Sequence, residues 1–241
     1  MSSLAAPGAS ATSAESSHAV ELDLLDHLDA IPVTAIQQIE LTRSSMVIKR
    51  AVDLTGALVG ILAMSPFMLA MAIAVKLNTR GPVFFRQQRV GRHGVHFEIL
   101  KIRTMVHDAE SLKDSLAEHN QARDGLFKIG DDPRVTRVGK YLRKTSLDEL
   151  PQLFNVLRGD MSLVGPRPLI LEEDSLMLGW RRRRLDLLPG MTGPWQMLGP
   201  TRASLSEMAV LDYHYVAGWS LWTDLKILVK TMTHVLSRRG I

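Results

Sequence analysis

The stretch LTGALVGILAMSPFMLAMAIAV, from Leu54 to Val75, decides how this chain is organised. Its 22 residues carry no charge, so a helix of this length could cross the hydrocarbon core of a bilayer. Ser65 and Pro66 lie near its middle. A proline inside a helix removes a backbone hydrogen bond and crowds the preceding turn, and a serine hydroxyl can bond the carbonyl that is freed. These residues predict a membrane helix that breaks and bends at Ser65-Pro66.

Basic residues stand on both sides of this stretch. Lys49 and Arg50 precede it, and Lys76, Arg80, Arg86 and Arg89 follow it. Because basic residues mark the cytoplasmic side of a membrane segment, we expect a re-entrant helix that dips into the bilayer and returns to the same face. The alternative is an ordinary spanning helix with a tolerated proline, since proline is frequent in membrane helices.

Charge is distributed unevenly along the 241 residues. Residues 1–42 hold six acidic and no basic residues, whereas the remainder holds all 29 Lys and Arg against 19 acidic residues. A basic body favours polyanionic partners: nucleic acid, acidic lipid headgroups or phosphorylated substrates. The chain has no cysteine, which excludes disulfides and thiolate metal sites. We expect three parts: a disordered acidic arm (1–44), the membrane helix (45–79) and a cytoplasmic or interfacial domain (80–241).

Two extended runs after the apolar stretch predict a small β-hairpin. Val83 to Val90 and Phe97 to Ile102 are separated by the four-residue loop Gly91-Arg92-His93-Gly94. Met105 to Arg123 then places apolar residues at helical spacing among charged ones, which predicts a surface helix. Asp131 to Arg134 is typical of a loop.

Asp148 and Glu149 form the chemical centre that the sequence suggests. Adjacent carboxylates repel, so an exposed pair needs a helix terminus, cations or a metal to keep both ionised. Ser146 and Glu149 fit a capping box, while Pro151 favours a helix start nearer Asp148. In either case we expect the positive end of a helix dipole to lower the pKa of the aspartate and keep it an anionic nucleophile. A capped helix with a solvated acidic first turn is the plainer alternative.

Basic residues near this pair are candidates for phosphate binding. Arg143 and Lys144 lie just upstream. Arg167 lies between Pro166 and Pro168, which stiffen the backbone and fix the direction of the arginine. A rigid guanidinium suits bidentate phosphate binding, although a proline-rich turn with a surface arginine would have the same sequence.

Two later stretches suggest contact with a membrane. The four arginines 181–184 are explained either by a solvated face or by contact with anionic lipid. Residues 219–239 predict an amphipathic helix whose tryptophans suit the level of lipid headgroups. Its apolar stripe could lie in the membrane interface or face the core. The stripe is formed by Leu221, Leu225, Leu228, Met232 and Val235.

Together these residues resemble the bacterial sugar transferase family, the monotopic polyprenol-phosphate phosphoglycosyl transferases. The matching motifs follow one another in the family's order over residues 46–240, and so many motifs in register are far more specific than one alone. They are RAVDL (50–54), SP (65–66), GPVFFRQ (81–87), RVG (89–91), ILKIRTM (99–105), DPRVT (132–136), LRKTSLDELPQL (142–153), GDMSLVGPRP (159–168) and WSLWTDLK (219–226).

The resemblance implies an α+β fold, mainly α, with a re-entrant helix-break-helix segment, interfacial amphipathic helices, the hairpin and a compact cytoplasmic catalytic domain. It implies transfer of a sugar 1-phosphate from a nucleotide diphosphosugar, usually a UDP-sugar, to polyprenol (undecaprenyl) phosphate, with UMP released. Such a step initiates polysaccharide or glycoconjugate assembly. The enzyme would be monotopic on the cytoplasmic face of the inner membrane, with Mg²⁺ as cofactor and anionic lipids as neighbours. No nucleic acid partner is expected, and a homo-oligomer is left open.

The resemblance also implies roles for particular residues. Asp148 matches the nucleophile, which would form a covalent aspartyl phosphosugar, and Glu149 matches the magnesium ligand. Ser65 and Pro66 match the helix break. Basic residues match the substrate- and phosphate-binding motifs at Arg143, Arg167, Lys101, Arg103 and Arg134.

Some features leave other functions open. Pro194, Pro200 and Ala217-Gly218 depart from the family pattern in loops that bear on the choice of sugar. A relative acting on another nucleotide sugar or another lipid acceptor is the nearest alternative. A non-catalytic basic membrane scaffold would release no UMP, and a membrane-anchored nucleic-acid-binding protein would bind DNA with a steep dependence on salt. The chain shows no P-loop, no dinucleotide fingerprint and no nucleophile elbow.

Overall fold

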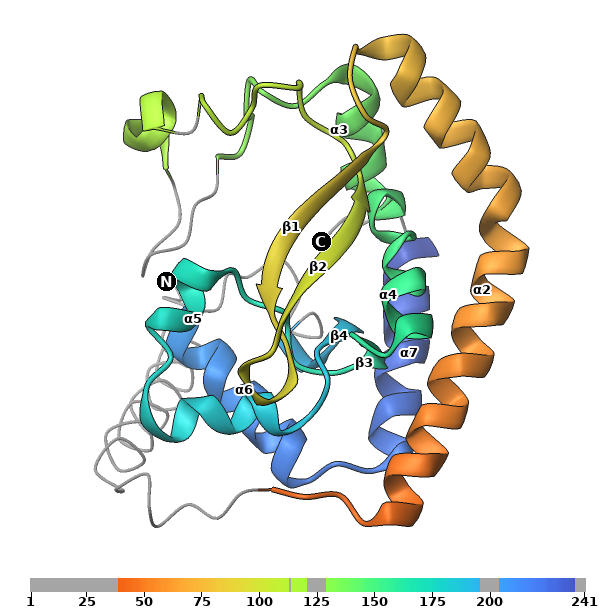
Figure 1. The fold of residues 1–241 in the computed structure, drawn as a ribbon, viewed down its shortest axis with the longest axis vertical. Coiled ribbons are helices and arrows are strands. Elements are labelled where there is room, and N and C mark those ends of the chain that lie inside the picture. Colours follow the sequence, from red (N-terminus) through yellow and green to blue (C-terminus); the bar gives the residue numbers. More distant parts are fainter. Residues whose placement is uncertain (1–38, 113, 121–128, 196–203, 237–241) are drawn as a thin grey trace, which may run out of the picture.

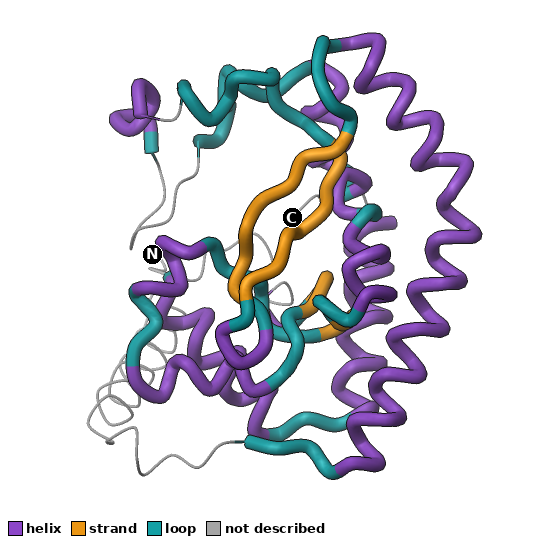
Figure 2. Tube along the Cα trace, viewed as in Figure 1, coloured by secondary structure: helices purple, strands orange, loops and turns teal. Residues whose placement is uncertain are grey.

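The structure is a computed structural model that describes residues 39–112, 114–120, 129–195 and 204–236. It is mainly helical with two small sheets, as Figures 1 and 2 show, and this agrees with the predicted fold class. The predicted disordered arm lies almost wholly outside the described residues. The main elements are α2 (Arg43–Asn78), β1 (Phe84–Val90), β2 (His96–Ile102), α3 (Arg137–Lys144), α4 (Gln152–Arg158), β3 (Ser162–Val164), α5 (Leu171–Ser175), β4 (Gly190–Thr192), α6 (Leu205–Ala217) and α7 (Leu221–Leu236). Short 3₁₀ helices are Arg92–Gly94, Asp114–His119, Leu147–Glu149 and Gly179–Asp186.

The apolar stretch forms the centre of one helix, α2, which continues through Pro66 without interruption. Proline has no N–H for the carbonyl of Leu62, and the Ser65 hydroxyl donates to that carbonyl at 3.1 Å. The hydrogen bond predicted for the Ser65 hydroxyl is therefore present, but the predicted break of the helix at Ser65-Pro66 is not. With the carbonyl satisfied, the helix bows away from the rest of the molecule instead of ending at Pro66 (Figure 1).

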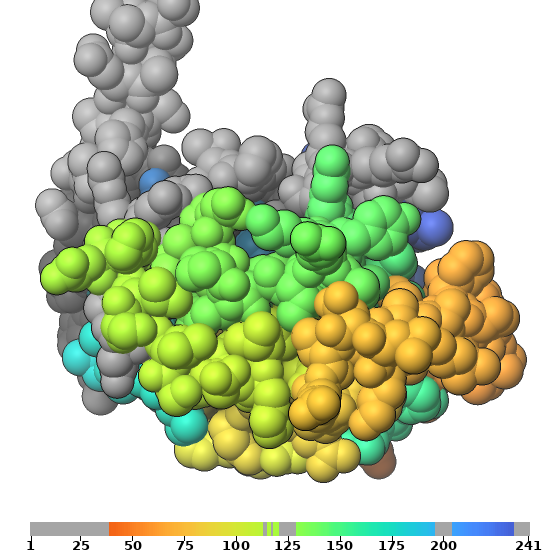
Figure 3. Space-filling view, turned by 90° about the horizontal axis from the view of Figure 1, so that it is seen from above, coloured from red at the N-terminus to blue at the C-terminus, as the bar shows by residue number. Residues whose placement is uncertain are grey.

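Both halves of α2 pack against the rest of the domain, called the body below, through β2, α3 and α4. In the first half Ala57 joins Ile99 and Leu153 in one apolar cluster, and in the second half Val75 joins Leu142 in another. Figure 3 shows the C-terminal end of α2 lying against neighbouring segments of that body. Both ends of the helix therefore approach the same domain. A re-entrant path requires this arrangement, and the path itself stays a prediction.

The opposite face of α2 is apolar and exposed. Among the described residues, α2 is the one helix that is long and apolar enough to cross a membrane. A large exposed apolar face of this kind is typical of a surface that contacts a membrane or another protein. Its exposed side chains include Leu54, Leu58, Val59, Leu62, Phe67, Leu69, Ile73 and Leu77.

Helix α7 resolves the alternatives for the C-terminal amphipathic segment. Its buried positions include Asp224 and Ile227, whereas Leu221, Leu225 and Met232 of the predicted stripe are exposed. The expectation that this stripe faces the core is therefore wrong for these residues. These three residues add to the exposed apolar surface of the molecule, whereas Leu228 of the same stripe packs against the core cluster that contains Ile227.

The predicted hairpin is confirmed. Strands β1 and β2 pair antiparallel, from Phe84 opposite Ile102 to Val90 opposite His96. The turn between them adopts positive φ at His93 (56°) and Gly94 (79°), which reverses the chain in few residues. The second sheet pairs β3 with β4 in parallel.

The α-helix expected over 105–123 is absent from its described residues, 105–112 and 114–120, and the prediction is wrong there. Met105 forms a β-bridge with Val135, turns follow, and a 3₁₀ helix covers Asp114–His119. The Ser111 hydroxyl donates to the carbonyl of Asp108, an example of local side-chain bonding that competes with a helix. Residues 121–128 lie outside the described part of the chain.

The four-arginine run is mainly structural. Arg184 is buried and pairs with Asp212 at 3.0 Å, while Arg182 pairs with Asp174 at 3.1 Å and Arg183 with Asp186 at 3.5 Å. A solvated face is therefore the wrong interpretation for Arg184. The run joins its own segment to α5 and α6.

Candidate active site

Asp148 lies in a tight turn between α3 and α4. Ser146 has a left-handed backbone (φ 54°), which is unusual for a residue with a side chain, and Leu147–Glu149 forms one 3₁₀ turn. The side chain of Ser146 makes no capping hydrogen bond, so the predicted capping box is absent. Helix α4 begins only at Gln152, with Pro151 as its N-cap, so the alternative start nearer Asp148 is not found either. Strained backbone of this kind is typical of functional sites.

Two basic side chains from different elements face the acidic pair. Lys101 reaches it from β2, with its Nζ 2.6 Å from Oε1 of Glu149. Arg143 reaches it from the end of α3 and also donates from Nε to the Thr104 hydroxyl at 2.8 Å. Both cations stabilise the anionic form of Asp148. The structure thus brings Lys101, Arg143, Asp148 and Glu149 together.

The pKa of the Asp148 carboxyl is raised, contrary to the expected lowering by a helix dipole. Burial is the main cause, and the neighbouring charge of Glu149 adds to it. Lys101 and Arg143 act in the opposite direction but do not fully compensate. The expected repulsion between the adjacent carboxylates is therefore real. Burial outweighs the dipole because Asp148 precedes α4 and is largely removed from water.

Two of the predicted basic residues are engaged by the protein itself. Arg103 donates to the carbonyls of Arg80 (2.7 Å) and Thr79 (3.2 Å) and so fixes the chain just after the C-terminus of α2. Arg134 forms a buried pair with Asp132 at 2.7 Å and lowers the pKa of that carboxyl through its hydrogen bonds. These bonds give both arginines a structural role, and their binding of substrate stays a prediction.

Arg167 follows β3 in the rigid turn expected from its two prolines. Its guanidinium lies 4.8 Å from the ring centroid of Trp195, a cation–π contact that orients it. The main chain of the turn is fixed from both sides. The Arg184 side chain donates to the carbonyl of Arg167, and Arg89 donates to that of Pro168 at 3.0 Å.

Arg89 is the residue whose position the sequence did not reveal. Burial lowers the pKa of its guanidinium to about 10, and the charge of Arg167 adds to this effect. Glu149 acts in the opposite direction. Arg89 therefore lies within electrostatic range of both the acidic pair and Arg167. The sequence places Arg89 in an extended run, but only the fold shows that Arg167 and Glu149 are among its charged neighbours.

Asp148 and Glu149 could supply the carboxylate ligands of a Mg²⁺ ion. This ion is commonly held by one or two carboxylates together with substrate phosphates, rather than by a full protein cage. Asp148 and Glu149 are adjacent, Asp148 is buried while Glu149 is partly exposed, and Lys101 already holds one oxygen of Glu149. Within the described residues no group of three or more His, Cys, Asp and Glu is placed to hold a metal. A Mg²⁺ ion held by this pair would complete its coordination with water and with oxygens of the substrate.

Comparison with known proteins identifies the family of this chain. The family model for bacterial sugar transferase matches residues 44–238. The chain therefore belongs to the bacterial sugar transferase family, and the resemblance drawn from its motifs is confirmed.

Three curated relatives show the extent of the similarity. The chain is 44% identical over 202 residues to the undecaprenyl-phosphate galactose phosphotransferase of Salmonella typhimurium, which covers 82% of this chain and 42% of the relative. It is 39% identical to the undecaprenyl-phosphate glucose phosphotransferase of Komagataeibacter xylinus, over 86% of this chain and 39% of the relative. It is 40% identical to the exopolysaccharide production protein ExoY of Rhizobium meliloti, over 80% and 87%. The chain thus spans less than half the length of the first two relatives.

Proposed function

We propose that this protein is a phosphoglycosyl transferase that moves a sugar 1-phosphate from a UDP-sugar to polyprenol phosphate and releases UMP. The observation that carries the proposal is the strained, buried turn that holds Asp148 and Glu149 between Lys101 and Arg143. The named activities of the galactose and glucose phosphotransferases support the same reaction class.

The proposed reaction has two displacements at one phosphorus. A carboxylate oxygen of Asp148 attacks the sugar-bearing phosphorus, and the bond from that phosphorus to the bridging oxygen breaks, so UMP leaves with the electron pair. An oxygen of polyprenol phosphate then attacks the same phosphorus and displaces Asp148, giving a polyprenol diphosphosugar. A carboxylate nucleophile divides one difficult step into two and lets a soluble and a lipid substrate use the site in turn.

The basic residues would stabilise the charge that both steps move. Phosphoryl transfer depends chiefly on positioning and on charge stabilisation. Lys101 and Arg143 lie beside the carboxylates, and Arg167 is fixed in a rigid turn beyond Arg89. Mg²⁺, held on Glu149 and the diphosphate, would neutralise the charge of the leaving UMP.

The exposed apolar surface supports a membrane location. The outward faces of α2 and α7 carry large apolar side chains, while both ends of α2 pack on the body that holds the acidic pair. This arrangement favours a re-entrant α2 at the cytoplasmic face of the inner membrane, with the lipid acceptor beside it.

A UMP-release assay over a panel of UDP-sugars, with undecaprenyl phosphate as acceptor, tests the proposal. We expect release that depends on both substrates for at least one sugar and that is lost in Asp148→Asn. Asp131→Asn is the matched control because Asp131 is an exposed aspartate that, among the described residues, pairs with Lys140 alone. Equal release by wild type and Asp148→Asn would overturn the proposed mechanism.

A further inference from the structure

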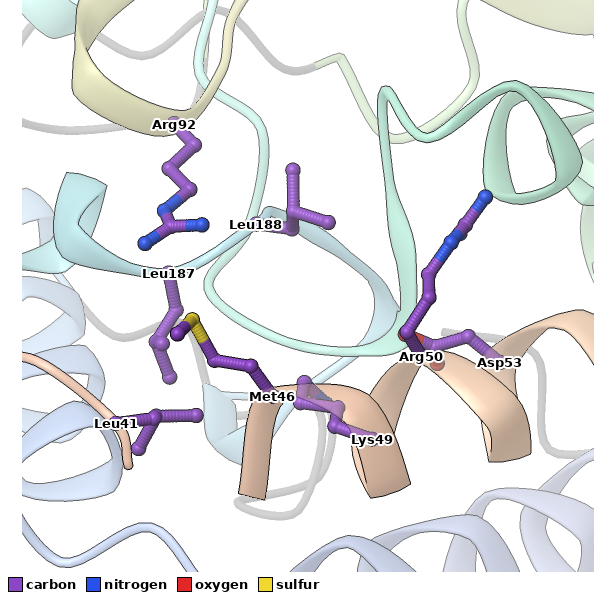
Figure 4. Close-up of a pocket in the computed structure, with 8 residues that line it drawn as sticks. All are labelled: Leu41, Met46, Lys49, Arg50, Asp53, Arg92, Leu187 and Leu188. Carbon is purple, nitrogen blue, oxygen red and sulfur yellow. The ribbon is translucent and has the colours of Figure 1, made fainter. Parts of the chain in front are cut away.

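A cavity of about 220 Å³ lies at the N-terminal end of α2. Figure 4 shows its lining, which combines apolar side chains with charged ones. The apolar part is Leu41, Met46, Leu187 and Leu188, and the charged part is Lys49, Arg50, Asp53 and Arg92. A concave site with mainly apolar walls and a few convergent polar groups is typical of ligand binding.

Three of the four charged residues are already bound by the protein. Lys49 pairs with Asp224 at 2.7 Å. Asp53 accepts from the Ser162 hydroxyl at 2.9 Å. Arg50 donates to the carbonyls of Val156 (2.7 Å) and Leu157 (3.0 Å) at the end of α4. These bonds join α2 to the body, so they explain the structural role of the three residues.

Arg92 is different. Its Nε donates to the carbonyl of Asp186 at 3.0 Å, which fixes the side chain in place. Its two terminal nitrogens donate no hydrogen bond to any residue that the structure describes. Figure 4 shows the guanidinium directed toward Leu187 on the cavity wall. The cavity therefore presents a fixed fork of two unused donors, the geometry that binds a phosphate in bidentate fashion.

The cavity is separate from the acidic pair. Arg92 lies in the turn of the hairpin, whereas Lys101 lies near the other end of β2, and a seven-residue strand spans about 23 Å. Arg50 meets the C-terminal end of α4, whereas Asp148 precedes its start, and seven helical residues span about 10 Å. A phosphate at Arg92 would therefore not be the one that reacts at Asp148.

We propose that this cavity binds the phosphate headgroup of an anionic membrane phospholipid. The fork of Arg92 would bind the phosphate, and the glycerol and first acyl carbons would lie against Leu41, Met46 and Leu188. Two observations favour a lipid over a free ion. The walls are largely apolar, and Val47 and Ile48 beside the cavity are exposed on α2, in continuity with its apolar face. With Asp224 counted beside Lys49, three cations still face only two carboxylates, and this excess of positive charge favours an anionic headgroup.

Native mass spectrometry of the full chain, released from nanodiscs of equal phosphatidylcholine and phosphatidylglycerol, tests this site. We expect one retained phospholipid with a preference for phosphatidylglycerol, reduced about tenfold in Arg92→Gln because one charge-assisted contact is lost. Arg86→Gln is the matched control: it removes the same charge from the same hairpin, at an exposed position. Arg92→Lys keeps the charge without the two-donor fork, so its retention of phosphatidylglycerol should lie between that of Arg92→Gln and that of Arg86→Gln.

Two results would overturn the proposal. One is a phosphatidylglycerol preference that is equal in wild type, Arg92→Gln and Arg86→Gln. The other is displacement of the lipid by glycerol phosphate as effectively as by dioctanoyl phosphatidylglycerol, which would make this a site for a free phosphate. The inference does not rest on the proposed chemistry, since Asp148→Asn should retain the lipid as wild type does.

Discussion

Two lysine–carboxylate pairs of nearly equal length have opposite surroundings. Lys49 and Asp224 lie 2.7 Å apart with side chains 8% and 6% exposed, and Asp224 also accepts from Tyr215 and Trp219. Lys101 and Glu149 lie 2.6 Å apart with side chains 24% and 31% exposed. The first pair is saturated by protein donors, as a buried structural charge must be. The second keeps capacity for other ligands.

The region around Asp148 shows the same contrast. Its carboxylate accepts a hydrogen bond from its own backbone N–H but from no described side chain, and burial raises its pKa. A structural role would give a buried carboxylate stabilising partners. The ionised Asp148 beside Glu149 is thus costly to the fold, while the pair of Lys49 and Asp224 holds α2 in place. The following substitutions test this difference.

The largest effect is expected at Asp148. Asp148→Asn removes the proposed nucleophile with little change in shape, so UMP release should fall by roughly a thousandfold or more. The assay with UDP-sugar and undecaprenyl phosphate measures it, and Asp131→Asn should stay near wild type. A modest loss shared by both variants would remove the distinction between the two aspartates.

The next effect is on stability, at the buried pair. Lys49→Met leaves Asp224 charged and unpaired, which should cost about 3–5 kcal/mol of unfolding free energy. Thermal unfolding in matched detergent measures this as a lower Tm. The double variant Lys49→Met/Asp224→Leu should recover part of the loss because no buried charge remains. A Lys49→Met variant as stable as wild type would contradict the structural assignment.

Lys101→Met should show the reverse pattern. Because the pair with Glu149 is partly exposed, the change in unfolding free energy should stay below about 1 kcal/mol. The rate of UMP release should fall by roughly a hundredfold, since a cation beside the reacting groups is lost. Comparison of both quantities with those of Lys49→Met separates the two roles. A variant that loses stability but keeps its rate would reverse them.

Sequence patterns predicted the parts of the molecule that depend on local order. The apolar run, the bonding of Ser65 at Pro66 and the two alternating strands are set by residues a few positions apart. The burial of Arg184 depends on Asp212, which is 28 residues away. The failure of the helix at 105–123 depends on pairing with Val135. Such partners cannot be read from spacing.

The candidate site shows the same limit. Adjacent carboxylates and nearby arginines indicated the centre, but not the direction of the Asp148 pKa shift, because burial is a property of the whole fold. Arg89 stands in β1 among other polar residues, and only the turn at Pro168 shows what it holds.

The pH dependence of the transfer rate and of stability follows from the raised pKa of Asp148. Transfer needs the carboxylate, so the rate should fall as pH drops through a value above the ordinary 3.8. Glu149→Gln should move this acid limb to lower pH, and Lys101→Met to higher pH, because their charges act on Asp148 in opposite senses. Profiles of kcat/KM measure the limb. A limb that neither substitution moves would mean that another group controls it.

Stability should respond in the opposite sense to activity. The folded state holds the Asp148 proton more tightly than the unfolded state, so stability falls as pH rises through the raised pKa. Asp148→Asn cannot ionise and should therefore have a higher Tm than wild type at pH 7. A lower Tm in that variant would show that the carboxylate stabilises the fold.

The smallest effect is expected at Arg89. Arg89→Gln keeps a donor toward the carbonyl of Pro168 but removes the charge between Arg167 and Glu149. We expect KM for the UDP-sugar to rise about tenfold with kcat changed less, since one charge-assisted contact is worth about that much. Arg86→Gln, exposed on the same strand, is the control. A loss of stability equal to that of Lys49→Met would place Arg89 among the structural charges.

The most direct measurement is the site of the covalent intermediate. The protein would be incubated with a UDP-sugar that supports turnover, in the absence of polyprenol phosphate, and then quenched and analysed by peptide mass spectrometry. We predict one added sugar phosphate on the peptide containing Asp148, lost on addition of the acceptor and never formed in Asp148→Asn. An adduct on another residue, or one that persists in Asp148→Asn, would contradict the account.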